Sequence, residues 1–175
     1  PNIIAKGESN GLSVIAMAEE GAIASVPDIY MEKIAVGGDL PADVVGLDVE
    51  PAVNLKVLAK AKRMAVGDLV VCILDRPRHR ELVAKVREAG ARIMLIADGD
   101  LSGIVATVWP ESGIDIYMGS GGAREGVLAA AALACAGGQM QGRLIARNDD
   151  EKRKAAAFGA GDPGRIFTVA EMSGK

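Results

Sequence analysis

The chain of 175 residues has a formal net charge of −3, and half of its residues are apolar while only 3% are aromatic. This length predicts one domain with a sizeable core built from aliphatic side chains. The acidic balance argues against a general nucleic-acid-binding surface, which needs a positive field to displace phosphate counterions.

The sequence predicts neither a membrane span nor a disulfide framework. The longest uncharged run, Gly126 to Gly142, is rich in Ala and Gly and too weakly apolar to cross a bilayer. Cys72 and Cys135 both lie in apolar stretches without metal-type spacing, so we expect two reduced thiols in the core. Reduced thiols favour a cytoplasmic protein. The chain begins at Pro1 rather than Met, which suggests a piece of a longer protein.

The first 36 residues predict strands added to a sheet. Apolar runs over 13–18 and 29–36 are separated by residues typical of turns. Residues 37–50 are rich in Gly, Pro and Asp and predict a connection. This connection is the best internal boundary in what we expect to be a single domain over 1–175.

Residues 51–148 predict alternating helices and strands. The expected helices cover 51–64, 78–89, 101–108 and an Ala-rich stretch through Cys135; the expected strands cover 69–74, 92–97, 114–118 and 140–146. Residues 149–175 predict a charged helix to Phe158 and a polar tail. The alternation predicts an α/β fold with a mostly parallel sheet flanked by helices.

The first helix of this alternation has an apolar spacing that predicts its buried face. Pro51 suits the first helical turn. The residues expected on the buried face are Val53, Val57, Leu58 and Ala61.

Three successive predicted strands are followed by polar segments, at 75–79, 98–100 and 119–126. Ligands of open parallel sheets bind beyond the carboxyl ends of the strands, so we expect these segments to share one crevice. Arg76 and Arg78, at a helix start, suit a phosphate group; solvated helix-start residues are the alternative. His79, the single histidine, is expected to position the turn.

The other two polar segments carry carboxylates. Asp98 and Asp100 flank a glycine and could bind a metal ion or accept hydrogen bonds from sugar hydroxyls. A capped turn, with Asp100 as the N-cap of the following helix, is the alternative. The Gly-rich segment at 119–126, interpreted as a loop, would allow close approach to an anion. Glu125 would lie in the first turn of a helix, either near that anion or simply at the surface.

Six stretches at these positions resemble class II fructose-1,6-bisphosphatases of the GlpX type. They cover nearly the whole chain in the right order. They read VIAMAE from Val14, DIYMEKIAVG from Asp28, VCILDRPRH from Val71, LIADGD from Leu95, GGAREGVLAAAA from Gly121 and GRLIARND from Gly142.

The resemblance implies a sugar-phosphatase fold of the inositol monophosphatase and fructose-1,6-bisphosphatase type. It implies hydrolysis of the 1-phosphate of fructose 1,6-bisphosphate, with Mn²⁺ or Mg²⁺, in cytoplasmic gluconeogenesis. The sugar bisphosphate is then the small-molecule partner. Glu125 falls at a metal-ligand position, and the substrate-contact positions are Tyr30, Arg76, Pro77, Arg78, Asp98, Gly99, Asp100 and Gly122.

The departures from the family pattern limit what the chain can do alone. The family's Asp-Pro-x-x-Gly-Thr type motif and further acidic ligands lie upstream and have no equivalent here, and Arg124 stands where a smaller or neutral residue is common. Metal-assisted hydrolysis needs several ligands and an activated water. We therefore expect most of the substrate site and one metal ligand, with little or no activity from the chain alone.

Two other functions stay open, and we also make one prediction about assembly. A non-catalytic sugar-phosphate-binding module is the main alternative. A dinucleotide-binding domain is less favoured, because Arg124 stands where the third glycine of G-x-G-x-x-G belongs. A piece of a larger protein exposes a sheet edge or helix face that is otherwise covered, so we also expect a homo-oligomer.

Overall fold

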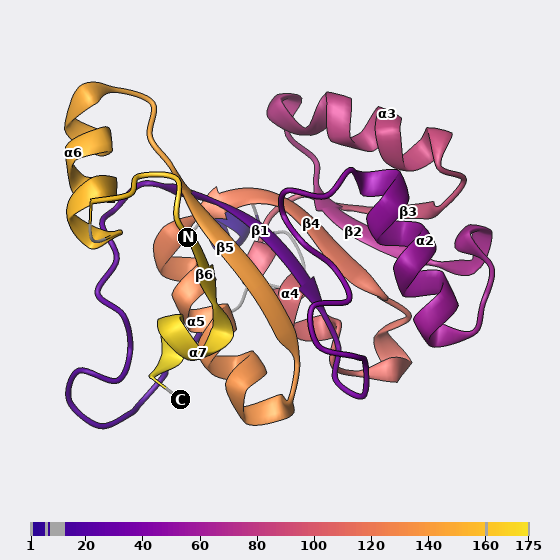
Figure 1. Cartoon of the computed structure of the whole chain (residues 1–175), viewed down its shortest axis with the longest axis horizontal. Coiled ribbons are helices and arrows are strands. Elements are labelled where there is room, and N and C mark those ends of the chain that lie inside the picture. Colours follow the sequence, from indigo (N-terminus) through magenta and orange to yellow (C-terminus); the bar gives the residue numbers. More distant parts are fainter. Residues whose placement is uncertain (1, 6, 8–12, 160, 175) are drawn as a thin grey trace.

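The structure, a computed structural model, describes residues 2–5, 7, 13–159 and 161–174. Its centre is a six-stranded sheet with the order β3-β2-β4-β1-β5-β6 (Figure 1). The strands are β1 (Tyr30–Val36), β2 (Val70–Leu74), β3 (Arg92–Ile96), β4 (Ile116–Gly122), β5 (Gln139–Ile145) and β6 (Ile166–Thr168).

Four of these strands run in the same direction. β2 pairs in parallel with β3 and β4, whereas β1 lies between β4 and β5 and is antiparallel to both. β6 pairs antiparallel with β5 at the outer edge. The predicted α/β class, with a mostly parallel sheet flanked by helices, is confirmed.

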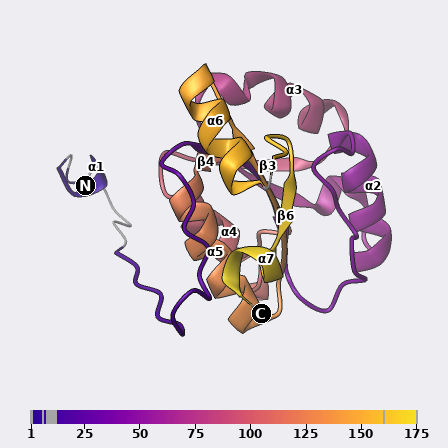
Figure 2. The same ribbon diagram turned by 60° about the vertical axis from the view of Figure 1, so that its left-hand side comes forward.

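Helices cover both faces of the sheet. They are α1 (Asn2–Ala5), α2 (Pro51–Lys62), α3 (Arg80–Glu88), α4 (Asp100–Ala106), α5 (Ala123–Ala136), α6 (Asp149–Phe158) and α7 (Val169–Ser173), with short 3₁₀ turns at Val66–Asp68, Pro77–His79 and Pro110–Ser112. Figure 2 shows α2 and α3 on one side of the sheet and α4 and α5 on the other. None of the described helices is both long and apolar enough to cross a membrane.

Alternate side chains of β1 belong to two different hydrophobic cores. Met31 and Ala35 pack with α4 and α5, while Ile34 and Val36 pack with α2 and α3. Successive side chains of a strand point to opposite faces, so a strand buried on both faces joins both cores. Lys33 shares the α4 and α5 face with Met31 and Ala35, and its side chain is buried.

One predicted strand is absent and one predicted buried face is wrong. Residues 13–18, which are all described, form no strand, and Ile15 and Met17 are exposed there. On α2 the buried residues are Asn54, Leu55, Leu58 and Ala59, whereas Val53 and Val57 are exposed. The true face is rotated because Asn54 turns inward to bond the backbone of Gly46 and Val49.

Three further expectations are corrected. Residues 119–122 belong to β4 and are not a loop, because they pair with β1 residue by residue. The expected polar tail contains β6 and α7, and Thr168 and Glu171 form a capping box at the start of α7. Cys135 is exposed, while Cys72 is buried and burial raises the pKa of its thiol to about 12.

Candidate functional site

The sheet topology brings five chain segments to one edge. The carboxyl ends of β2, β3, β4 and β5 lie at this edge, and so does the start of β1, where Tyr30 pairs with Gly122 of β4 and Ile145 of β5. The three predicted polar segments therefore converge, as expected for the carboxyl ends of parallel strands. The antiparallel insertion of β1 adds Tyr30, and the end of β5 adds Arg147.

A cavity of about 660 Å³ lies at this edge. All but one of the predicted site residues line it, and they are Tyr30, Arg76, Arg78, Asp98, Gly99, Asp100, Gly122 and Glu125. Pro77 does not line the cavity and instead begins the 3₁₀ turn Pro77–His79. The structure thus gathers residues of four separate segments around one cavity, namely the start of β1 and the three predicted polar segments.

The cationic part of the cavity surrounds Tyr30. The guanidinium of Arg78 lies 4.9 Å from the centre of the Tyr30 ring and that of Arg147 lies 4.8 Å from it. Arg78 donates from Nε to Ser120 Oγ at 3.0 Å and from Nη2 to the Ser120 carbonyl at 2.6 Å. Arg76 lies 3.9 Å from Asp98 and is more loosely held. Such fixed guanidinium groups suit a phosphate.

The two aspartates after β3 take different positions. Asp98 is partly exposed and accepts a hydrogen bond from the Gly99 amide at 2.9 Å. Gly99 adopts φ +81°, a conformation that glycine reaches without strain, and it redirects the chain into α4. Asp100 begins α4, is buried, and accepts from the Leu101 amide at 2.9 Å. The helix cap is Gly99, so the expectation of an Asp100 N-cap is wrong.

Lys33 lies beneath the cavity and was not predicted as a site residue. Its ammonium group forms a buried ion pair with Asp100 and donates to the carbonyl of Gly122 at 2.7 Å. Burial lowers the pKa of Lys33, and the charge of Asp100 opposes that shift. Lys33 thereby connects β1 to the starts of α4 and α5.

The glycines at the end of β4 leave room for carboxylates. A Cβ atom at Gly121 would lie 2.0 Å from Asp100 Oδ2, and one at Gly122 would lie 1.9 Å from Glu125 Oε2. Any other residue would displace these carboxylates from their positions. Close approach to acidic side chains therefore explains the Gly-Gly pair, in place of the anion-binding loop that we expected.

His79 supports the same edge as a neutral ring. Its Nδ1 lies 2.7 Å from the carbonyl of Leu74, and its Nε2 accepts from the Ser120 amide at 2.9 Å. These partners require the proton on Nδ1, and burial lowers the pKa of the imidazole. The bonds join the end of β2 to β4, in keeping with the expected positioning role.

Comparison with known proteins identifies the family. A family model described as "Bacterial fructose-1,6-bisphosphatase, glpX-encoded" matches residues 1–175. The chain belongs to this family. The resemblance noted from the six sequence stretches is thereby confirmed.

Curated proteins with similar sequences carry the name of a class 2 sugar bisphosphatase. Proteins named D-fructose 1,6-bisphosphatase class 2/sedoheptulose 1,7-bisphosphatase are 37% identical in Synechococcus sp. (strain JA-2-3B'a(2-13)) and 39% identical in Crocosphaera subtropica. The alignments cover 99% and 98% of this chain but 54% and 49% of those proteins. The chain thus spans about half the length of these relatives.

The family resemblance implies that Glu125 is a metal ligand, and Glu125 lines the cavity. Across residues 2–5, 7, 13–159 and 161–174, no group of three or more His, Cys, Asp or Glu side chains could hold a metal ion. Asp100, which lines the same cavity as Glu125, is paired with Lys33.

Proposed function

We propose that this chain is the substrate-holding half of a cytoplasmic class 2 fructose-1,6-bisphosphatase of gluconeogenesis. The reaction is hydrolysis of the 1-phosphate of fructose 1,6-bisphosphate. The observation that carries the proposal is the cavity that Tyr30, Arg76 and Arg78 line together with Asp100 and Glu125. The family match over the whole chain supports the same reaction.

In this proposal different cavity residues bind the phosphate and the sugar parts of the substrate. Arg76, Arg78 and the Tyr30 hydroxyl bind phosphate oxygens, since charge-assisted hydrogen bonds from guanidinium groups are strong and directional. Asp98 and Asp100 accept hydrogen bonds from sugar hydroxyls, and the backbone at Gly99 and Gly122 gives the sugar close approach.

The proposed metal role belongs mainly to the other half of the protein. Glu125 supplies one oxygen ligand to Mn²⁺ or Mg²⁺ from the first turn of α5. When bound, such a cation polarises the phosphoryl group and activates a water molecule. Because no group of three or more His, Cys, Asp or Glu side chains among the described residues could hold a metal ion, we propose that this chain alone binds sugar phosphate without hydrolysing it.

A chimera tests this proposal. The chain replaces the matching part of the Synechococcus enzyme, and phosphate release from fructose 1,6-bisphosphate with Mn²⁺ is compared between the chimera and the chain alone. We expect activity in the chimera only. Hydrolysis by the chain alone would place a complete metal site within these 175 residues, and an inactive but folded chimera would favour the non-catalytic binding module.

The dinucleotide-binding alternative loses its structural basis. Gly119 to Gly122 lie in β4 and pair with β1, so they form no turn around a pyrophosphate.

A further inference from the structure

Arg147 reaches the cavity from the family-like stretch that begins at Gly142, in which the sequence analysis assigned no site residue. It follows β5 by two residues, at the strand end where Ile145 pairs with Tyr30. Its side chain lines the same cavity as Arg76 and Arg78. Figure 1 shows that this connection leads into α6, which stands away from α2 and α3 at the other end of the sheet.

Two arginines from different segments are held against the same ring. Arg147 donates to Glu151 from Nε at 3.2 Å and from Nη2 at 2.7 Å, while the Arg147 amide donates to Glu151 Oε2 at 2.8 Å. Arg78 is held instead by neutral partners, the hydroxyl and the carbonyl of Ser120. Both guanidinium groups lie within 5 Å of the Tyr30 ring centre.

The hydrogen bonds of these arginines leave donors for a ligand. Within the part of the chain that the structure describes, Nη1 of Arg78 and Nη1 of Arg147 have no hydrogen-bond partner. Glu151 offsets one positive charge, so the pair of arginines keeps a net positive charge beside Tyr30. An anion with several acceptor oxygens can accept from these Nη1 groups, since both arginines line the same cavity.

We propose that Arg147 and Arg78, on the Tyr30 ring, bind the phosphate group of the substrate that is not hydrolysed. The Glu125 carboxylate repels a phosphate unless a cation stands between them, whereas the charge of Asp100 is already offset by Lys33, so the phosphate held without metal lies at the arginines. This inference rests on the proposed function and adds a specificity role. Arg147 selects sugars with a second phosphate group.

Calorimetric titration of the 175-residue chain tests the assignment with fructose 6-phosphate, fructose 1-phosphate and fructose. We expect the 6-phosphate to bind most tightly and fructose not to bind. Arg147→Ala should weaken binding of the 6-phosphate about tenfold or more, the range for loss of a charge-assisted hydrogen bond. Arg147→Lys keeps the charge but not the planar guanidinium group. Its affinity for fructose 6-phosphate should therefore lie between those of the wild-type chain and of Arg147→Ala.

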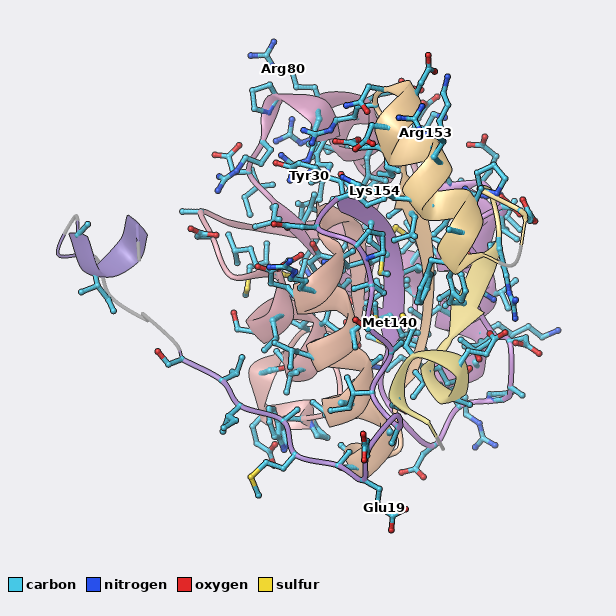
Figure 3. All side chains as sticks on the ribbon, turned by 90° about the vertical axis from the view of Figure 1, so that its left-hand side faces the viewer. Glu19, Tyr30, Arg80, Met140, Arg153 and Lys154 are labelled. Atoms are coloured by element: carbon cyan, nitrogen blue, oxygen red, sulfur yellow. The ribbon has the colours of Figure 1, made fainter. Side chains whose placement is uncertain are left out.

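Arg153→Ala is the matched control. Arg153 projects from α6, is paired with Asp150, and does not line the cavity (Figure 3). The substitution removes one positive charge from the same region, as Arg147→Ala does, and should leave the affinity for fructose 6-phosphate unchanged. Circular dichroism checks that each variant folds, which we expect because the Arg147 side chain is 58% exposed.

The outcomes separate this inference from the proposed function. Equal affinity of Arg147→Ala and Arg153→Ala for fructose 6-phosphate would overturn the role of Arg147 while leaving the sugar-phosphate site in place. Tighter binding of the 1-phosphate than the 6-phosphate would overturn the assignment of which phosphate is held. A wild-type chain that binds no sugar phosphate would overturn the proposed function and this inference with it.

Discussion

Lys33 is a fully buried ammonium group within a strand of apolar neighbours. A buried charge costs several kcal/mol unless it is paired and hydrogen-bonded. Here Asp100 and the Gly122 carbonyl provide that pairing. The sequence predicts the strand but not the role of Lys33, because Asp100 lies 67 residues further along the chain. Contacts of this range depend on strand order, which no local pattern contains.

Replacing Lys33 tests how much the ion pair contributes to the fold. Lys33→Met keeps most of the apolar stem but leaves the Asp100 carboxylate buried without its cation. We expect a loss of about 3 kcal/mol in the free energy of unfolding, the range for breaking a buried pair by removing one partner. Urea denaturation followed by circular dichroism measures it.

Lys152→Met serves as the control for Lys33. Lys152 pairs with Asp149 at the surface, where both side chains are largely exposed. Exposed pairs contribute little, so this variant should unfold at nearly the wild-type urea concentration. Equal stability of the two variants would show that Lys33 is not the counter-ion on which Asp100 depends.

At the scale of elements, periodicity predicts where helices and strands occur better than which face is buried. The core strands over 70–74, 92–96 and 139–145 and the helices over 51–62 and 149–158 agree with the sequence patterns within a few residues. The face of α2 was wrong because Asn54, a polar residue, is buried through its bonds to Gly46 and Val49. β6 was missed because it has only three residues.

Substitutions on α2 distinguish the observed face from the predicted one. Leu58 is fully buried and Val57 is 45% exposed. Leu58→Ala should lower the free energy of unfolding by about 2–5 kcal/mol, whereas Val57→Ala should change it by less than about 1 kcal/mol. The urea midpoints of the two variants measure this. Comparable losses would mean that Val57 packs in the core, as the spacing alone suggested.

At the scale of the whole molecule, the site could be predicted in part because parallel strands send their loops to one edge. Three of the contributing segments follow this rule. The other two, the start of β1 with Tyr30 and the end of β5 with Arg147, require knowing that β1 inserts antiparallel between β4 and β5. Self-association stays a prediction, and its physical basis is the edge strand β3, where Met94 and Leu95 are exposed.

The proposed division between a substrate-holding half and a metal-holding half predicts different responses to a chelator. Arginine and tyrosine donors hold phosphate without a cation, so EDTA should leave the affinity of the 175-residue chain for fructose 6-phosphate unchanged. The chimera with the Synechococcus enzyme should lose phosphate release in EDTA and regain it with excess Mn²⁺. If EDTA instead abolished binding by the chain alone, the cation would be held by these residues, and Glu125 with Asp100 would be the first ligands to replace.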